Sequence, residues 1–323
     1  MLKRISRGLI LIGLLFAVSC IKEDVSNCGA DVQVQYYYTL NPQQVNLFEQ
    51  KVQQMGIYIF DGEGLYYDYR TINDPAQIRN NQPIRFKLPT GDYTLLSWGG
   101  TPDWYDSGER TEETPFQFGL RKGVTRLSDF RLWIQWYKAG GEEQLIAKEP
   151  ADLYHGQPTQ IKVGNDRATA TRIGLIKNTH TINVLITGIE FLLPNYQPGQ
   201  SLFDIYCIGG NGRYQHDNTF DKSAETVKYL PSSNQFVDNQ VIASIKVMRM
   251  ISEEPFWLTV ADKHSGEVYF KFDMMPYIMQ LPAYMTQEDI DREDEFDIKL
   301  QIGMDLSLVI WINGWKLIDV IPQ

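Results

Sequence analysis

The chain has few of the residues on which most catalytic and metal sites depend. Among its 323 residues are three cysteines and four histidines, and no HExxH, CxxC, GxSxG or GxxxxGK[ST] motif occurs. These absences exclude the usual signatures of zinc proteases, dithiol redox proteins, α/β-hydrolases and P-loop enzymes. The histidines lie far apart beside turn residues, so we expect them at surface or turn positions: His155, His180, His216 and His264. We predict a protein that is not an enzyme, with no cofactor, no bound metal and no small-molecule substrate.

Basic residues are also scarce. The chain carries 30 Lys and Arg against 40 Asp and Glu, and no arginine occurs between Arg7 and Arg70. Loss of residues 1–19 would remove three basic residues and no acidic one, which moves the net charge from −10 to −13. Such an acidic protein repels nucleic-acid phosphates and anionic lipid headgroups. We predict neither a nucleic-acid partner nor electrostatic binding to membranes.

The apolar run at the N-terminus is too short to cross a bilayer. A spanning helix needs roughly 20 apolar residues, and this run, Leu9–Val18, has ten. It follows three basic residues and leads into small residues, which is the pattern of a secretory signal peptide over residues 1–19. Cys20 comes directly after Ala17-Val18-Ser19.

A cysteine at such a position can take a diacylglycerol on its thiol and a further acyl chain, such as palmitate, on its freed amine. Two or more chains make release from a membrane slow, because each buried methylene contributes about 0.8 kcal/mol. We therefore predict a bacterial lipoprotein lipidated at Cys20. The alternative is an ordinary secreted protein in which Cys20 merely follows the cut.

Residues 20–30 are expected to form a lipidated tether, since charged residues directly follow Cys20. Export permits disulfides, and Cys28 and Cys207 are the cysteines that remain. Their separation in the sequence leaves open whether they form a bridge.

Period-2 alternation dominates the rest of the chain. In the first segment, 31–39, Val32, Val34, Tyr36 and Tyr38 share one face of a predicted strand. Similar short runs continue to the C-terminus without helices of the length that joins parallel strands. About 300 residues are more than one core usually covers. We predict two tandem antiparallel β-sandwich domains, over residues 31–163 and 164–323, with a polar break at 164–167.

Local signals predict individual turns and one helix. Asn313-Gly314 predicts a tight hairpin turn, and Gly91 is expected to supply a positive φ between two strands. The charge run 286–295 predicts a short helix, and segment 99–115 predicts a long polar loop.

Two groups of side chains deserve a test as ligand sites. The acidic residues at 293–297 lack the glycine and the alternate spacing of a calcium loop, and no spacing pairs Glu190 or Asp204 for glycoside hydrolysis. Among the aromatic residues we expect three tryptophans in the core: Trp98, Trp133 and Trp136. Trp104 and Tyr105, in the polar segment, are expected to be an exposed pair on which a sugar could stack.

Segments spread over the chain in a consistent order resemble one family. They are Cys20 with Asp24–Cys28, Ile57–Asp61, Leu88–Tyr93 running to Ser97–Gly99, Asp152–Gly156, Asn178-Thr179 with Ile182–Val184, Ile290–Asp297 and Trp311–Trp315. Jointly they resemble the fimbrial anchor subunits of the FimB/Mfa type found in Bacteroidales, which are outer-membrane lipoproteins. The resemblance implies two transthyretin-like β-sandwich domains and a structural role in cell adhesion at the base of a surface fimbrium.

This resemblance suggests a functional reason for the absence of arginine between Arg7 and Arg70. Shaft subunits of such fimbriae resemble lipoproteins that an arginine-specific protease cuts after their first strand, which opens a groove for a neighbour's strand. The first strand, 31–39, and the connector, 41–54, contain no arginine. We expect this chain to keep its first strand and its lipid.

The resulting prediction is a lipid-anchored, surface-exposed subunit at the fimbrium base on the cell outer membrane. It would hold a shaft pilin by β-strand addition and limit the length of the fimbrium. The alternatives are a lipidated tip or accessory pilin and a surface glycan-binding lipoprotein.

Overall fold

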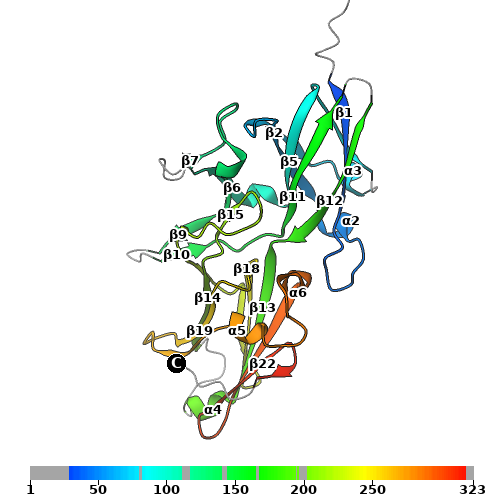
Figure 1. Cartoon of the computed structure of the whole chain (residues 1–323). Coiled ribbons are helices and arrows are strands. Elements are labelled where there is room, and N and C mark those ends of the chain that lie inside the picture. Colours follow the sequence, from blue (N-terminus) through cyan, green and yellow to red (C-terminus); the bar gives the residue numbers. More distant parts are fainter. Residues whose placement is uncertain are drawn as a thin grey trace, which may run out of the picture.

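The computed structural model describes residues 29–79, 82–110, 117–139, 144–164, 167–193, 195 and 202–317. The backbone is built almost entirely of strands, in two β-rich parts that give an elongated molecule (Figure 1). The predicted all-β class is confirmed. The predicted signal peptide, Cys20 and Cys28 lie outside the described residues. The α-helices of the described residues are short: α2 (Phe48–Lys51), α3 (Pro75–Arg79), α4 (Ile189–Leu192), α5 (Met275–Ile278) and α6 (Gln287–Arg292). Within the described ranges, none of the helices has the length and apolar character needed to cross a membrane.

The upper part in Figure 1 contains a seven-stranded sheet that folds over one hydrophobic core. Both wings of the sheet supply core side chains, for example Val34 from one wing and Ile57 from the other. The two wings therefore form a sandwich. The strands in spatial order are β3 (Tyr66–Ile72), β2 (Gln54–Asp61), β5 (Gly91–Gly100), β11 (Leu153–Val163), β12 (Thr169–Lys177), β1 (Ala30–Tyr37) and β4 (Ile84–Leu88).

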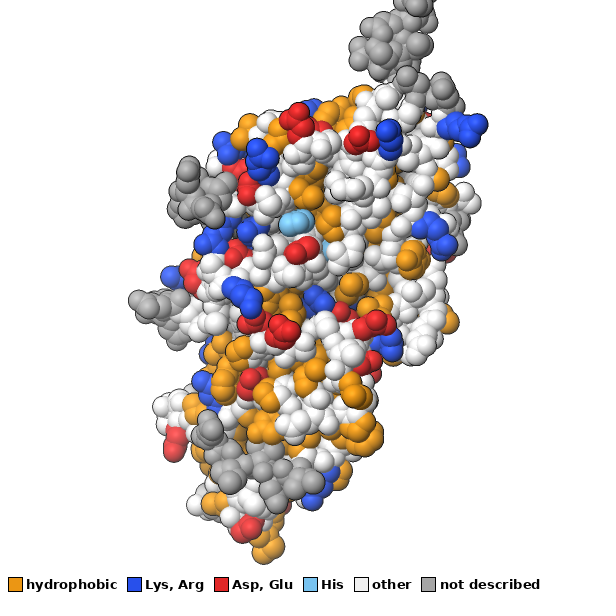
Figure 2. Space-filling view, in the orientation of Figure 1, with side chains coloured by type: hydrophobic (Ala, Val, Ile, Leu, Met, Phe, Trp, Pro, Cys, Tyr) orange, Lys and Arg blue, Asp and Glu red, His pale blue; other side chains and the backbone are white. Residues whose placement is uncertain are grey.

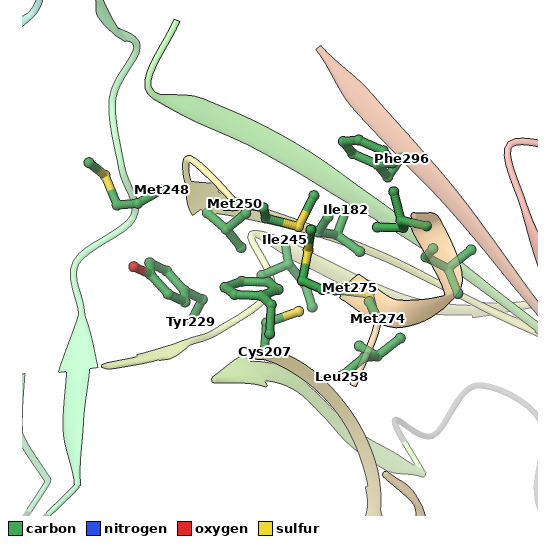
Figure 3. Packing of buried hydrophobic residues seen from close by; sticks show 14 of the residues in the cluster. Ile182, Cys207, Tyr229, Ile245, Met248, Met250, Leu258, Met274, Met275 and Phe296 are labelled. Carbon is green, nitrogen blue, oxygen red and sulfur yellow. The ribbon is translucent and has the colours of Figure 1, made fainter. Parts of the chain in front are cut away.

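The lower part consists of two six-stranded sheets with a shared core. One sheet is ordered β17 (Ser233–Val237), β18 (Gln240–Met248), β13 (Thr179–Thr187), β21 (Glu295–Ile302), β22 (Leu308–Ile312) and β23 (Trp315–Lys316). The other is ordered β20 (Val268–Asp273), β19 (Phe256–Asp262), β14 (Phe203–Gly209), β16 (Val227–Tyr229), β10 (Leu145–Ala147) and β9 (Trp136–Lys138). Figure 3 shows side chains of both sheets in this core, among them Ile182 and Ile245 of the first and Cys207 and Leu258 of the second. The predicted sandwich architecture is confirmed.

A fourth sheet joins the two parts. Its order is β15 (Arg213–Gln215), β8 (Phe130–Ile134), β6 (Tyr105–Glu109) and β7 (Gln117–Phe118), with the 3₁₀ turns η2 (Pro102–Trp104) and η3 (Leu127–Asp129) beside it. The prediction of a polar loop over 99–115 is therefore wrong for the residues that form β6. Because β8 pairs with β15, and β10 with β16, the segment 105–147 belongs to the lower part as much as to the upper.

The sheets divide at Asn178 and not at the predicted boundary between residues 163 and 164. β12 pairs with β1 and β11 and completes the upper sandwich, whereas β13, which begins one residue after Asn178, pairs with β18 and β21 of the lower one. A nearly continuous run of extended chain thus crosses from one sandwich to the other.

Among the residues that the structure describes, most strand pairs are antiparallel, as predicted, but three are parallel. β1 runs parallel to β12, β13 to β21, and β10 to β16. These pairs join segments far apart in the chain, which two-residue turns cannot connect.

The local turn predictions have mixed outcomes. Asn313 and Gly314 both have positive φ, 47° and 80°, so the tight hairpin turn is confirmed. The predicted helix in 286–295 is α6, whose N-terminus has a capping box between Thr286 and Asp289. The positive φ expected at Gly91 is wrong, because Gly91 begins β5 and is not among the glycines with positive φ.

Candidate functional site

The first strand is fully built into the upper sheet. β1 lies between β12, which pairs with it in parallel, and β4, which pairs with it antiparallel. The chain's own strands therefore occupy one edge of β1 over Val32–Tyr37 and the other edge over Ala30–Val34. A groove that an incoming strand could enter at this place is already filled.

The side chains of the first strand fill the upper core. Val32, Val34, Tyr36 and Tyr38 are at most 2% exposed, which confirms the predicted buried face. The Tyr36 ring stacks on Phe48 with 5.9 Å between centroids, and the Tyr36 hydroxyl lies 2.8 Å from Ser97 Oγ. Burial of two valines and two tyrosines makes removal of this strand costly, at about 1.5–3 kcal/mol for each large apolar side chain.

The connector, residues 41–54, is fastened to the end of β1. The fully buried Asn41 donates from Nδ2 to the carbonyls of Tyr38 (3.0 Å) and Val45 (2.8 Å). Asn46 Oδ1 accepts from the backbone N–H of Tyr38 at 3.0 Å, and Leu47 N–H donates to Tyr38 O at 2.9 Å. The two asparagines hold the connector as a compact turn against the strand that it follows.

Exposed residues nevertheless occur along this connector. Gln43 is exposed in the turn, and its neighbour Gln44 has a positive φ of 55°. Lys51 is exposed at the end of α2, where its N–H donates to Leu47 O. The connector therefore offers surface to a protease but, as the sequence shows, no arginine.

Tyr38, the residue after the end of β1, lies at the junction between the two sandwiches. Its ring meets Tyr154 edge-on at 5.0 Å. Burial raises the pKa of the Tyr38 hydroxyl, and the nearby carboxylates of Asp294 and Asp152 raise it further. Each of these carboxylates has a lysine partner: Lys177 Nζ is 2.7 Å from Asp294, and Lys246 Nζ is 2.7 Å from Asp152.

The junction also holds a buried ion pair and an amide pair. Arg249 and Asp291 form a bidentate pair at 2.6 and 2.7 Å, and both side chains are less than 10% exposed. Asn178 and Asn218 donate to each other through their side-chain amides. Such fully bonded buried groups favour one relative arrangement of the elements that carry them.

A cavity of about 540 Å³ adjoins this network, with Arg249, Asn218, Phe220 and Gln287 in its lining. Because the Arg249 charge is already paired with Asp291, we assign no ligand to the cavity. In the part of the chain that the structure describes, no three His, Cys, Asp or Glu side chains gather as a metal site. The carboxylates weighed in the sequence have structural partners or are exposed: Asn183 donates to both Glu295 and Asp297 at 3.0 Å, while Glu190 and Asp204 lie at the surface.

The aromatic and histidine predictions are partly wrong. Trp98 and Trp133 are buried as expected, but Trp136 is 44% exposed on the edge strand β9. Trp104 is 55% exposed, whereas Tyr105 is buried, so the expected exposed pair does not form.

Two of the histidines expected at the surface are buried, because each finds a backbone partner. His155 Nε2 lies 3.0 Å from His216 O, and His180 Nδ1 accepts from Met250 N–H at 3.2 Å. His216 is half-buried and His264 is exposed. Cys207 is buried in the lower core as a free thiol, and its possible partner Cys28 lies outside the described residues.

Two features of the structure were not predicted from the sequence: the junction network, and an apolar surface at the far end of the lower sandwich. Arg249 and Asp291 are 42 residues apart in the sequence, so no local pattern joins them. The apolar surface could have been found from the sequence. Met304 and Leu306 are apolar residues in a segment with the composition of a turn, Gly-Met-Asp-Leu-Ser, and turns lie at the surface.

Comparison with known proteins gives a consistent result. The minor fimbrium anchoring subunit Mfa2 of Porphyromonas gingivalis is 24% identical, over 94% of this chain and 90% of that protein. The solved structure of the fimbrial anchor protein Mfa2 from the same species has a TM-score of 0.70 at 21% identity, covering 91% of this chain and 100% of that one. A candidate polysaccharide-binding protein of Bacteroides thetaiotaomicron has a TM-score of 0.75 at 21% identity, covering 89% and 97%. These likenesses show a shared fold.

The resemblance noted in the sequence is confirmed by a family model, described as fimbrillin-A associated anchor proteins Mfa1 and Mfa2, that matches residues 25–320. The match begins before β1 and ends beyond β23, so it includes both sandwiches and the junction between them. The chain therefore belongs to the family of fimbrillin-A associated anchor proteins Mfa1 and Mfa2.

Proposed function

We propose that this chain is a non-enzymatic, lipid-anchored subunit that attaches a surface fimbrium to the outer membrane and limits its length. Membership of the anchor family supports a structural role as a fimbrial anchor or accessory subunit at the cell surface. The finer role, as the base of the fimbrium, rests on the lipid predicted at Cys20 and on the first strand.

The observation that carries the proposal is the retained first strand. A shaft subunit must offer an open groove to the strand of a neighbour. In this chain β1 fills that place with both edges paired, and the connector behind it has no arginine at which a protease could cut. A subunit without an open groove cannot accept the strand of a neighbour, so it ends the row of subunits in the fimbrium. A terminal subunit that keeps its lipid would stand at the membrane.

Such a subunit can still join the shaft pilin by β-strand addition. Because β1 occupies the anchor's own groove, strand addition would use the groove of the pilin or a free sheet edge of the anchor. β4 is an edge strand of the upper sheet, and an edge strand can accept a further strand.

Deletion of the gene tests the proposal. We expect the deletion strain to shed fimbriae that are longer than those of the parent strain, and a plasmid copy to restore short, attached fimbriae. A tip or accessory pilin would leave attachment and length unchanged, and that result would overturn the proposal.

A further inference from the structure

The end of the lower sandwich farthest from β1 carries exposed apolar side chains. We call this surface the distal pole and define it by residues 188–193, which contain α4, and residues 303–307, the turn between β21 and β22. Phe191 is 38% exposed, Leu306 57% and Met304 84%. Figure 2 shows hydrophobic side chains with acidic ones beside them at this lower tip.

The two segments of the distal pole are held together by a close backbone contact. Gly188 has a φ of 76°, and a Cβ built on it would lie 2.1 Å from the carbonyl oxygen of Ile302. No residue with a side chain fits there, so α4 lies directly against the end of β21. Ile189, fully buried, fixes the start of α4 in the core. Phe191 and the turn with Met304 and Leu306 thus share one fixed surface.

Leu306 stands in a backbone conformation that leucine disfavours. Its φ is +62°, in a turn closed by Gly303 N–H to Ser307 O at 2.8 Å and by Leu306 N–H to Gly303 O at 3.0 Å. Hairpin loops of this kind favour glycine or asparagine at the left-handed position. Every other non-glycine residue with positive φ in the described ranges is polar: Gln44, Asn218, Asp238, Asn239 and Asn313.

An exposed leucine at this position helps neither folding nor solubility. It adds backbone strain where glycine would have none, and it leaves an apolar side chain in water. Strained residues are expected where function requires them. Contact with an apolar partner accounts for both features of Leu306.

The charges of the distal pole indicate the chemistry of that partner. Glu190 and Asp305 are exposed there, and neither 188–193 nor 303–307 contains a lysine or arginine. A complementary surface would therefore have an apolar centre with basic residues at its rim.

The position of the pole indicates which partner it meets. β1, which begins ten residues after Cys20, lies at the upper end of the molecule, and α4 lies at the lower end (Figure 1). If the lipid holds the upper end near the membrane, a fimbrium must leave from the lower end. We propose that the distal pole docks the first shaft pilin, through an apolar pilin surface rimmed by lysine or arginine. This inference rests on the proposed function and adds to it the surface of contact.

Binding of the full-length protein to fimbriae shed by the deletion strain tests the proposal. Met304→Ser and Leu306→Gly should each weaken this binding at least tenfold. Leu306→Gly should at the same time leave the melting temperature unchanged or raise it by about 2 °C, because glycine accepts the positive φ. A loss of binding without a loss of stability cannot come from unfolding.

Matched controls are available elsewhere on the surface. Met285 is 71% exposed and lies before α6, away from the pole, and Phe118 is 71% exposed on β7. Met285→Ser and Phe118→Ser should bind shed fimbriae as the wild-type protein does. Glu190→Lys should weaken binding and reduce its dependence on salt.

The outcomes separate this inference from the proposed function. If the wild-type protein binds shed fimbriae and the distal-pole variants bind equally well, the docking surface lies elsewhere and the inference fails alone. If the deletion strain sheds no fimbriae, the anchor role itself fails and the inference fails with it.

Discussion

The Tyr36 hydroxyl and the Ser97 hydroxyl lie 2.8 Å apart in the upper core and join the first strand to β5 across the sandwich. Both residues are buried, at 2% and 0% exposure. Tyr36→Phe should leave Ser97 without this partner and lower the free energy of unfolding by about 1–3 kcal/mol. Urea denaturation of the chain carrying Cys20→Ala measures this change.

A double-mutant cycle distinguishes the hydrogen bond from general packing. Ser97→Ala should also destabilise the protein, and the double variant should lose clearly less than the sum of the two single losses. Additive losses would show that the two hydroxyls do not stabilise each other.

A new arginine in the connector should make the first strand cleavable. Gln43→Arg places the arginine in an exposed turn, so an arginine-specific protease should cut there readily. Lys51→Arg should be cut more slowly, because residue 51 ends α2 and its N–H is bonded to Leu47 O. Electrophoresis and N-terminal sequencing after timed digestion measure both rates.

Cleavage alone should not release the domains at once. β1 would remain paired with β12 and β4, so release from the lipid requires the strand to be displaced. Shedding should therefore speed up when a competing strand is present. The wild-type protein should stay uncut at 41–54, and natural protein that begins near residue 45 would contradict the terminal role.

Replacement of Cys20 by alanine should abolish the membrane attachment. Without the thiol no diacylglycerol can be added, and the acyl chains that hold the protein in the membrane are lost. The variant should leave the outer-membrane fraction and take up no labelled palmitate. Unchanged retention and labelling would contradict the lipoprotein prediction.

The sequence predicted those features whose cause is local. Alternation over residues 31–38 gave the buried face of β1 because side chains of a strand point to opposite faces in turn. Asn313-Gly314 gave its hairpin turn because both residues accept positive φ.

Features that depend on distant partners were not predictable. Glu109 belongs to a segment that is polar in sequence, yet it is 1% exposed because Arg121 and Thr125 satisfy its carboxylate. The parallel pairing of Val34 with Thr171 joins segments more than a hundred residues apart. For the same reason the boundary was placed at 163/164, before the strand that completes the upper sandwich.

Two buried histidines should make the protein less stable in weak acid. In an unfolded chain histidine takes up a proton as the pH falls through about 6.5. Burial lowers the pKa of His155 and of His180 to about 3 in the folded protein. Between pH 6.5 and pH 3 the unfolded state therefore binds protons that the folded state does not. Stability should be complete above pH 6.5 and fall as the pH decreases, by up to about 1.4 kcal/mol per pH unit for each histidine.

Substitution of one histidine measures how much that histidine contributes to the loss of stability in weak acid. His180→Asn keeps an acceptor for the N–H of Met250 but has no group that titrates in this range. Between pH 7 and pH 5 the variant should lose about 2 kcal/mol less stability than the wild-type protein, in urea denaturation at each pH. Most carboxylates titrate below this window, near pH 4, so they add little to the difference. Identical pH dependence in His180→Asn and in the wild-type protein would mean that His180 is protonated in the folded state, which its burial at 1% exposure opposes.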